Sequence, residues 1–307
     1  MPGEFDFIDW LRAQTPASSR VLISPGDDCA AITSPSRALL VTTDMLMDGT
    51  DFILAEVGPR RVGRKAMSAN LSDIAAMAGT PVAAVVSVAL PRESGRSLAE
   101  ELYLGLRDVA DAFGVPIIGG DTNSWTGRLV ISVTALGEAT ARGAVTRSGA
   151  KPGNWLFVTG PLGGSILGHH LDFTPRVREA LLLHAAVELH AMIDISDGLA
   201  ADLNHICEES RCGAVLKAEA IPVSPAAVEL SRTSGKTPIQ HALGDGEDFE
   251  LVFAVSPGDG EKLLRSPPVP GLTKIGECVD AGLWLEEGGV RKELKAMGWV
   301  HELGERG

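Results

Sequence analysis

The sequence predicts a protein of mixed α and β structure in two domains, and three observations support this prediction. The chain has 307 residues, a length that ordinarily divides into about two domains. Short apolar runs typical of strands alternate with amphipathic segments of helical period. Residues 143–153 are rich in Gly and Arg, with Pro152 just before a new apolar run. We therefore expect domains at residues 1–140 and 141–307.

The first half combines helices with strands, in an order that indicates an α+β unit with a mixed sheet. Apolar patterns predict strands at residues 20–32 (interrupted by an acidic turn), 38–43, 82–90, 115–118 and 129–137. Helical periodicity predicts helices at residues 5–11, 59–78 and 98–113. The second and third of these helices end at Gly79 and Gly114, as glycine commonly ends helices.

The second half indicates an α/β domain. Apolar runs predict strands at residues 155–159, 192–194, 214–218, 249–255 and 272–278, and helical patterns cover residues 161–170, 175–189 and 199–206. The strand that ends at Asp194 runs into a helix, which we expect Ser196 or Asp197 to cap. Trp284 and Trp299 fall in a tail with little pattern.

Composition narrows the class of protein. With 45% hydrophobic and 22% charged residues, the chain is typical of a globular protein with a full core. Its net charge of −13 disfavours nucleic acid and anionic membranes as partners. The start M-P-G-E-F-D has no basic segment and no apolar signal core, and no apolar run has the length of a membrane span, so we expect a cytoplasmic protein. The four cysteines lack metal-binding spacing and are expected to be buried, reduced thiols.

Acidic residues stand beside apolar runs at six places along the chain. The motifs are G-D-D at 26–28, T-T-D at 42–44, N-L-S-D at 70–73, G-G-D-T at 119–122, I-D-I-S-D-G at 193–198 and G-D-G-E-D at 244–248. Clustered carboxylates repel one another unless cations neutralise them, and oxygen ligands favour Mg²⁺ or Mn²⁺. Glycine leaves backbone N–H groups open to phosphate oxygens. The motifs together indicate nucleotide phosphate chemistry that depends on Mg²⁺.

Taken in this order, the motifs resemble the thiamine-monophosphate kinase family of the aminoimidazole ribonucleotide synthetase-like superfamily. Other matching stretches are K-A-M-S-A-N-L-S-D at 65–73, T-R-S-G-A-K-P-G at 146–153 and G-E-D-F-E-L at 246–251. The resemblance implies a two-domain fold in which the N-terminal domain joins a second copy's in an intersubunit β-barrel, giving a homodimer. It also implies ATP-dependent phosphorylation of thiamine monophosphate to thiamine diphosphate, by direct in-line transfer assisted by several Mg²⁺ ions.

The same resemblance assigns roles to residues. Those matching the family's metal ligands are Asp28, Thr42, Thr43, Asp44, Asp73, Asp121, Asp194 and Asp197. Those matching nucleotide contacts are Tyr103, Gly120, Asp121, Arg147 and Ser196, and those matching contacts to the thiamine rings are Glu247 and Trp299. Of all these residues, we expect Asp44, Asp121, Arg147 and Asp197 to carry catalysis.

The chemistry of these residue types agrees with the implied reaction, although purely structural roles for Arg147, Trp299 and Asp197 stay open. An acceptor phosphate is already ionised near neutral pH, so alignment and charge neutralisation matter more than a strong base. Arg147 can bind phosphate through its forked guanidinium, or it is a surface residue in a linker. Trp299 can face a cationic thiazolium ring, or it packs the tail. Asp197 can bind a metal ion or only cap a helix.

One position departs from the family pattern. Asp51 stands where the family usually has a His that contacts the substrate, and a carboxylate there would repel the acceptor phosphate. If Asp51 faces the acceptor, Asp51→His should lower the KM for thiamine monophosphate; if it points to solvent or caps a turn, it should not. Two alternative functions also remain: another ATP-using enzyme of the superfamily with a different phosphate or carbonyl acceptor, and a non-catalytic nucleotide-binding dimer.

Overall fold

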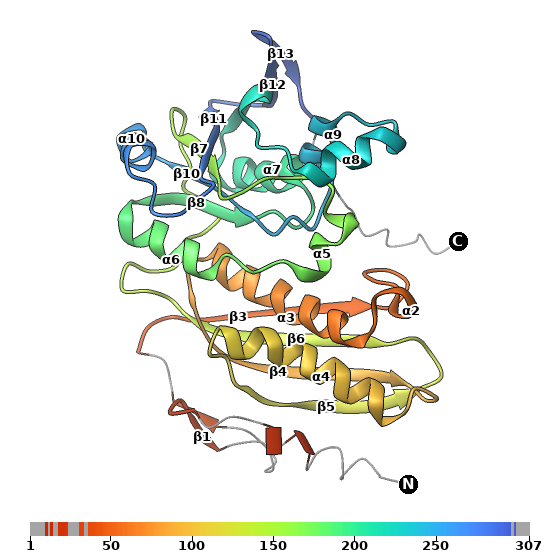
Figure 1. Ribbon diagram of the computed structural model, residues 1–307. Helices are drawn as coiled ribbons and strands as arrows, with labels where there is room; N and C mark the ends of the chain where they lie inside the picture. Colours follow the sequence, from red (N-terminus) through yellow and green to blue (C-terminus); the bar gives the residue numbers. More distant parts are fainter. Residues whose placement is uncertain are drawn as a thin grey trace, which may run out of the picture. The chain divides into compact units, whose positions relative to one another are not determined.

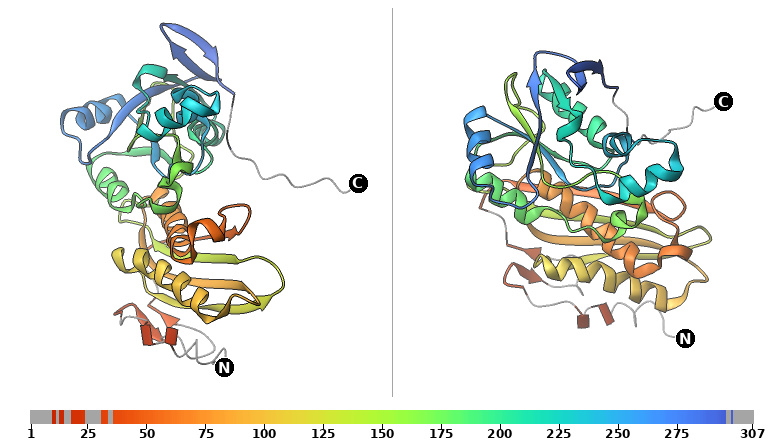
Figure 2. Two further views of the ribbon diagram at one scale, coloured as in Figure 1. Left: turned by 45° about the vertical axis from the view of Figure 1, so that its right-hand side comes forward. Right: turned by 45° about the horizontal axis from the view of Figure 1, so that its top comes forward.

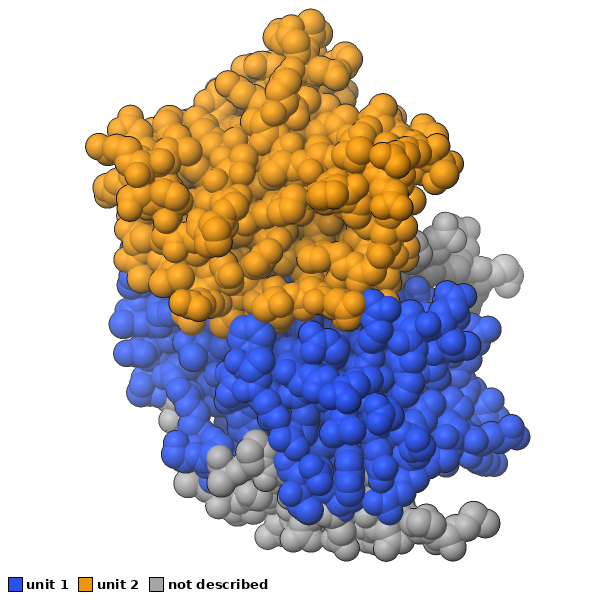
Figure 3. All heavy atoms as spheres, viewed as in Figure 1, with its two compact units in different colours: residues 1–74, 79–144 blue, residues 75–78, 145–307 orange. Residues whose placement is uncertain are grey.

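The protein divides into two compact units. The computed structural model describes residues 10–11, 13–14, 18–23, 31–33, 36–295 and 298 (Figure 1). Unit 1 comprises residues 1–74 and 79–144, and unit 2 comprises residues 75–78 and 145–307 (Figure 3). Within the described ranges, no helix combines the length and the apolar character needed to cross a lipid bilayer.

Unit 1 is built on a four-stranded mixed sheet. Its strands follow the order β3 (Leu39–Met47), β6 (Val130–Glu138), β4 (Thr80–Pro91) and β5 (Ile117–Trp125). The β4–β5 pair is parallel, and the β3–β6 and β4–β6 pairs are antiparallel, which confirms the predicted mixed α+β unit. Strands β3 and β5 run several residues further than predicted. The extra part of β5, from Gly119 onward, has little apolar signal of its own and is fixed by pairing with Val85–Pro91 of β4.

Helices α3 (Pro59–Ala76) and α4 (Gly95–Ala112) lie on one face of this sheet, preceded by the short helix α2 (Leu54–Val57) (Figures 1 and 2). The two long helices touch through glycine. A Cβ on Gly63 would lie 2.1 Å from the Leu102 carbonyl oxygen, and one on Gly105 would lie 1.9 Å from that of Arg60. Only glycine allows the two backbones to approach so closely.

The other face of unit 1's sheet carries exposed apolar side chains. Alternate residues of a strand point to opposite faces. Leu40 and Leu46 of β3 are buried, whereas Leu39, Val41, Met45 and Met47 are 47%, 62%, 60% and 40% exposed. A short antiparallel pair, β1 (Val21–Ile23) and β2 (Ala31–Ile32), packs Val21 and Ile32 against Val82, Ala83 and Ile118. Most of the predicted helix at 5–11 lies outside the described residues.

Unit 2 is built on a seven-stranded sheet. Its strands follow the order β13 (Val290–Glu293), β12 (Leu283–Glu287), β9 (Gly213–Lys217), β11 (Thr273–Val279), β7 (Trp155–Val158), β10 (Leu251–Val255) and β8 (Leu189–Asp194). The β12–β9 pair is parallel and the other pairs are antiparallel. Trp284 therefore lies in a strand, and its placement in an unpatterned tail was wrong. The hairpin that contains it turns at Gly288 and Gly289, whose φ angles are 56° and 80°.

Unit 2 packs apolar residues on both faces of its sheet. Helix α7 (Leu199–Ser210) places Leu199, Leu203 and Ile206 in one core cluster with Leu156 and other alternate strand residues. On the opposite face, Phe157 and Phe253 stack with ring centroids 5.7 Å apart. Helix α6 (Val177–Ala186) is shorter than predicted because Leu189 already belongs to β8.

The predicted helix at 161–170 was wrong. That segment is largely loop, with a 3₁₀ turn η1 (Ser165–Leu167) and the short helix α5 (His169–Asp172) at its end. Gly163, Gly164 and Gly168 adopt φ angles of 88°, 74° and 133°, which break a right-handed helix. Unit 2 also contains the 3₁₀ turn η2 (Ala218–Ala220) and the helices α8 (Pro225–Ser234), α9 (Pro238–Gly244) and α10 (Pro257–Arg265).

The cysteines of unit 2 behave as predicted. Cys207 and Cys278 are buried, Cys212 is partly buried, and all three are free thiols. Burial raises the pKa of Cys207 to about 12 and also raises the pKa of Cys278. These thiols stay protonated near neutral pH and serve packing. Cys29 lies outside the described residues.

Candidate active site

In unit 1, strand β3 and helix α3 bring together three of the predicted metal ligands. Thr42 and Asp44 share one face of β3 because they are two residues apart. The Thr42 hydroxyl donates to the Asp73 carboxylate of α3, with 2.5 Å between the oxygens. The Asp44 backbone N–H donates to the side-chain oxygen of Asn70, also on α3, at 3.1 Å. The predicted ligands Thr42, Asp44 and Asp73 therefore form one group, here called the β3–α3 acidic group.

Asp44 carries the clearest electrostatic signal of this group. Burial first, and then the negative charges of Asp73 and Asp51, raise the pKa of Asp44 to about 7. Its carboxyl group therefore holds a proton far more tightly than an exposed Asp does. A cation bound here would relieve the repulsion among the three carboxylates and favour the ionised form of Asp44.

The structure places Thr43 differently. Its hydroxyl donates to the Val133 carbonyl at 3.1 Å and accepts from the Thr134 hydroxyl at 3.0 Å, both on β6. By strand alternation, this side chain lies on the opposite face of β3 from Thr42 and Asp44. The Thr43 hydroxyl is thus not part of the β3–α3 acidic group.

Asp51 lies close enough to Asp44 to influence it, and it also has a structural task. Its carboxylate accepts the Met47 backbone N–H at 2.7 Å, which closes the turn after β3. Its backbone carbonyl accepts the Lys65 ammonium at 2.6 Å, and Lys65 is only 1% exposed. The turn-capping alternative therefore has a contact to support it.

The remaining predicted residues of unit 1 that the structure describes lie on β5 and α4. Asp121 is exposed and pairs in register with Ser87 of β4. Gly120 precedes it, where a Cβ would lie 1.8 Å from the Val86 carbonyl oxygen, so this position requires glycine. Tyr103 is only 7% exposed and packs edge-on against Trp10, with ring centroids 5.5 Å apart. The structure therefore gives Tyr103 a packing role within unit 1.

In unit 2, the segments 194–198 and 245–250 lie side by side. The Glu247 N–H donates to the Ser196 carbonyl at 2.7 Å, the Phe249 N–H to Ile195 at 2.8 Å, and the Ile195 N–H to Glu250 at 2.7 Å. Asp194, at the end of β8, is only 3% exposed. Asp194, Ser196, Asp197 and Glu247, which the sequence predicted as site residues, are thus gathered within one unit.

Glu247 differs from the other acids of its motif. Asp245 accepts the Gly164 N–H at 2.9 Å, and Asp248 accepts the Gly163 N–H at 2.9 Å. Glu250 pairs with Arg176 in a two-pronged contact. These three carboxylates hold the surrounding loops in place. Glu247 is distinguished by its backbone, which has a φ angle of 63°, a conformation that non-glycine residues rarely adopt. A rare backbone conformation of this kind is often kept for function.

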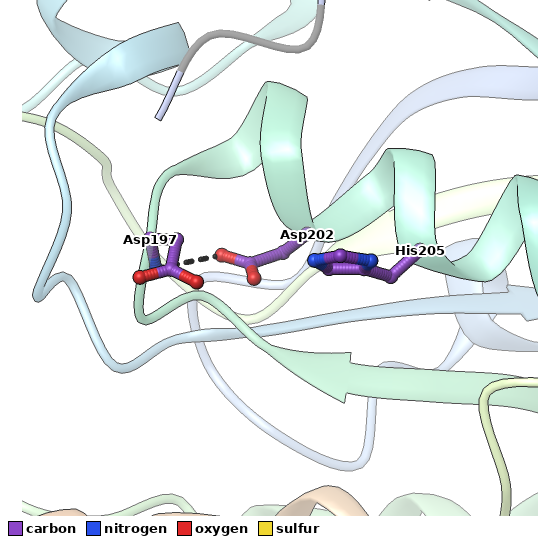
Figure 4. Close-up of side chains that lie close together, drawn as sticks. All are labelled: Asp197, Asp202 and His205. Atoms are coloured by element: carbon purple, nitrogen blue, oxygen red, sulfur yellow. Dashed lines mark hydrogen bonds between the residues drawn. The ribbon is translucent and has the colours of Figure 1, made fainter. Parts of the chain in front are cut away.

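Sequence reasoning missed Asp202 and His205 on helix α7. Asp202 is only 2% exposed, and burial together with the charge of Asp197 raises its pKa to about 7. Asp197, Asp202 and His205 each offer a ligand atom within 4.8 Å of the other two (Figure 4). The spacing was visible in the sequence, since Asp202 and His205 are three residues apart and share one face of a helix.

The predicted cap of α7 was wrong. The N-cap residue is Gly198, and it makes no side-chain capping bond. Asp202, within the first turn, instead accepts the backbone N–H groups of Asp197 and Gly198, each at 3.0 Å. The N-cap residue and the residue before it are thus held by a carboxylate from inside the helix.

Arg147 is exposed in a loop of unit 2 that is anchored by α7. The Ser210 hydroxyl donates to the Arg147 carbonyl at 3.1 Å and accepts the N–H groups of Gly149 and Ala150, each at 3.1 Å. The backbone is thus held while the guanidinium group remains accessible. Asp28 and Trp299 lie outside the described residues.

Family models and known relatives show which family the chain belongs to. The model of the AIR synthase related protein N-terminal domain matches residues 26–139, and that of the C-terminal domain matches residues 151–283. A thiamine-monophosphate kinase of Rhodopirellula baltica is 41% identical over 92% of this chain and 91% of its own length. The chain belongs to the thiamine-monophosphate kinase family. A Mycobacterium tuberculosis member is 39% identical over 81% of this chain and 80% of its own length.

Solved structures of thiamine-monophosphate kinases share the fold. The enzyme of Stenotrophomonas maltophilia matches with a TM-score of 0.80 and 32% identity, covering 92% of this chain and 96% of that one. AaThiL complexed with AMPPCP and TMP matches with a TM-score of 0.77 and 31% identity, covering 98% and 97%. Escherichia coli HypE, a hydrogenase maturation protein, shares the fold at 19% identity and a TM-score of 0.79. The predicted two-domain fold and enzyme class are confirmed.

Proposed function

We propose that this chain transfers the terminal phosphoryl group of ATP to the phosphate of thiamine monophosphate, giving ADP and thiamine diphosphate. The observation that carries this proposal is the structural match to AaThiL complexed with AMPPCP and TMP, which covers 98% of this chain. The chain also belongs to the thiamine-monophosphate kinase family. A bond forms between an acceptor phosphate oxygen and the γ-phosphorus, and the bond from that phosphorus to the β–γ bridging oxygen breaks.

The donor set of the candidate site fits Mg²⁺. The β3–α3 acidic group offers hydroxyl and carboxylate oxygens, which are the ligands that Mg²⁺ prefers. Burial first, and then the charges of Asp73 and Asp51, raise the pKa of Asp44, and a cation would offset those charges. We assign Mg²⁺ binding to Asp28, Thr42, Asp44, Asp73, Asp121, Asp194 and Asp197, and leave out Thr43 because its hydroxyl is bonded to β6. Bound Mg²⁺ would supply neutralisation of phosphate charge in the transition state.

The chain's own residues then provide binding and alignment. We assign the exposed guanidinium of Arg147 to phosphate oxygens, since Arg binds them in a forked geometry. Ser196 and Gly120 would contact the nucleotide, whereas Tyr103, which is buried against Trp10, is not assigned a contact. Glu247 and Trp299 would hold the thiamine rings. The acceptor oxygen is ionised near neutral pH, so in-line alignment of the two phosphate groups accounts for most of the required acceleration.

A direct assay tests the reaction. The purified chain is incubated with ATP, Mg²⁺ and a panel of acceptors (thiamine monophosphate, thiamine, other phosphate monoesters and carboxylates), and products are identified by mass. Thiamine diphosphate formed with one equivalent of ADP supports the proposal. Phosphorylation of a different acceptor, or nucleotide binding with no turnover on any of them, overturns it.

We further propose that the N-terminal domain, residues 1–140, forms a homodimer through the outer face of its sheet. The support is the row of exposed side chains Leu39, Val41, Met45 and Met47 on one face of β3. Contiguous exposed apolar side chains of this kind mark interaction surfaces. A second copy of the same face would cover them symmetrically.

A further inference from the structure

The Asp202 carboxylate occupies the N-terminus of helix α7. One oxygen, Oδ2, accepts the Asp197 N–H group at 3.0 Å (Figure 4) and also the Gly198 N–H group at 3.0 Å. Gly198 is the N-cap residue and Asp197 precedes it, so the carboxylate reaches back from the first turn of the helix to the two residues before the helix. A buried carboxylate is well suited to this place, because the helix dipole favours negative charge there.

The segment that Asp202 holds is also fixed on its other side. The Ser196 carbonyl accepts the Glu247 N–H at 2.7 Å, and the Asp202 N–H donates to the Gly198 carbonyl at 3.0 Å. A Cβ on Gly198 would lie 3.1 Å from the Asp245 carbonyl oxygen, so the loop is packed closely against the neighbouring segment. Ser196 and Asp197 therefore have little backbone freedom while these contacts persist.

We propose that Asp202 is a positioning residue, which orients Ser196 and Asp197 by accepting backbone N–H groups and is not itself a metal ligand. The inference rests on the proposed function, which assigns nucleotide contact to Ser196 and metal contact to Asp197.

Two substitutions separate the acceptor role from the charge. Asp202→Asn keeps an oxygen that can accept both N–H groups but removes the negative charge. Asp202→Leu removes both while filling a similar volume. Asp259→Asn and Asp259→Leu are matched controls, because Asp259 is an acid in the first turn of another helix of unit 2, α10. Three quantities are measured: hydrogen exchange of the Asp197 and Gly198 amides, Mn²⁺ binding by electron paramagnetic resonance, and the kcat and KM for ATP.

In Asp202→Leu, we expect exchange of the two amides to accelerate at least ~10-fold and Mn²⁺ affinity to fall by ~10-fold or more, as when an outer-shell partner of a ligand is lost. The kcat should fall with it. Asp202→Asn should stay close to the wild type in all three, as should both controls. If Asp202→Leu does not fold, Mn²⁺ binding by Asp202→Asn alone tests the inference.

Two results would overturn the inference. The first is wild-type amide protection and Mn²⁺ binding in Asp202→Leu. The second is loss of Mn²⁺ binding in Asp202→Asn, which would show that the Asp202 carboxylate is itself a metal ligand. Amide exchange and Mn²⁺ binding need no turnover. A wild-type protein that binds Mn²⁺ but leaves thiamine monophosphate unchanged would therefore refute the proposed function and not the role of Asp202.

Discussion

The side-chain oxygen of Asn70 accepts the backbone N–H of Asp44 at 3.1 Å, and Asn70 is fully buried. Its amide group donates to the Ala66 carbonyl one turn earlier in α3, at 3.0 Å, which fixes its orientation. Helix α3 therefore holds strand β3 at Asp44 through Asn70 and at Thr42 through Asp73. The β3–α3 acidic group is set by the packing of two elements before any ligand binds, as an aligned site requires.

Asp44→Asn and Asp121→Asn should each lower turnover at saturating ATP and Mg²⁺ by ~10²-fold or more, because loss of one ligand misplaces the phosphate groups. Initial rates of ADP formation measure this. Asp111→Asn is the control, since Asp111 is an exposed partner of Arg107 on α4. Wild-type turnover in Asp44→Asn would remove Asp44 from the metal site.

Asp248 should make stability depend on pH. Burial is the main cause that raises its pKa from 3.8 to about 8, with added repulsion from Asp245 and Glu250. The folded state therefore binds this proton more tightly than the unfolded state, and its contribution to stability is lost as pH rises from about 4 to about 8. In Mg²⁺-free buffer, the Tm of Asp248→Asn minus that of the wild type should therefore rise from pH 5 to pH 8.

Thermal melts at several pH values measure this difference, and Asp280→Asn, at an exposed position of unit 2, serves as the control. A Tm difference for Asp248→Asn that stays constant over the whole range would show that the folded protein tolerates the ionised carboxylate.

The acidic residues of the candidate site could be predicted because each stands at the end of an apolar run. The contact between Ser196 and Glu247 could not, since it depends on β8 pairing with β10, 57 positions apart between Asp194 and Leu251. Sequence patterns within a window of a few residues carry no information on such pairing. Thr43 is a different case, because strand alternation alone turns its side chain away from Asp44, and this could have been predicted from the strand pattern.

Three helices of unit 2 had a clear signal that went unused. Helices α8, α9 and α10 each begin with a hydroxyl residue followed by proline: Ser224, Thr237 and Ser256 accept a backbone N–H at the helix start. This pairing of cap and proline is typical of helix N-termini. For α7 the same rule misled, because the capping carboxylate comes from Asp202, inside the helix.

The outer face of β3 should mediate dimerisation. Val41→Glu or Met45→Glu should convert the protein from dimer to monomer at micromolar concentration, because burying a charge without a partner is costly. Light scattering coupled to size-exclusion chromatography measures the mass. Leu264→Glu is the control, since Leu264 is 54% exposed on α10 of unit 2. A wild-type protein that is monomeric and active, or dimers that persist in both variants, would contradict this surface.

Asp51 combines two properties that substitution can separate. Its carboxylate accepts the Met47 N–H at 2.7 Å, and its charge contributes to the raised pKa of Asp44. Asp51→Asn keeps an acceptor for Met47 and removes the charge, whereas Asp51→His and Asp51→Ala remove the carboxylate oxygen. Asp48→Asn is the matched control, because Asp48 accepts the Leu54 N–H at 3.0 Å in the same segment.

Because the Asp51 carboxylate closes its own turn, we expect Asp51→Asn to leave the KM for thiamine monophosphate within about twofold of wild type. Asp51→His and Asp51→Ala should leave it unchanged or raise it, because loss of the charged hydrogen bond to Met47 loosens the turn after β3. Initial rates against acceptor concentration at saturating ATP measure this. A lower KM for the acceptor in Asp51→His or Asp51→Asn, with the KM for ATP unchanged, would instead show that the carboxylate repels the acceptor phosphate. Asp51 would then set acceptor affinity at the position where the family usually has histidine.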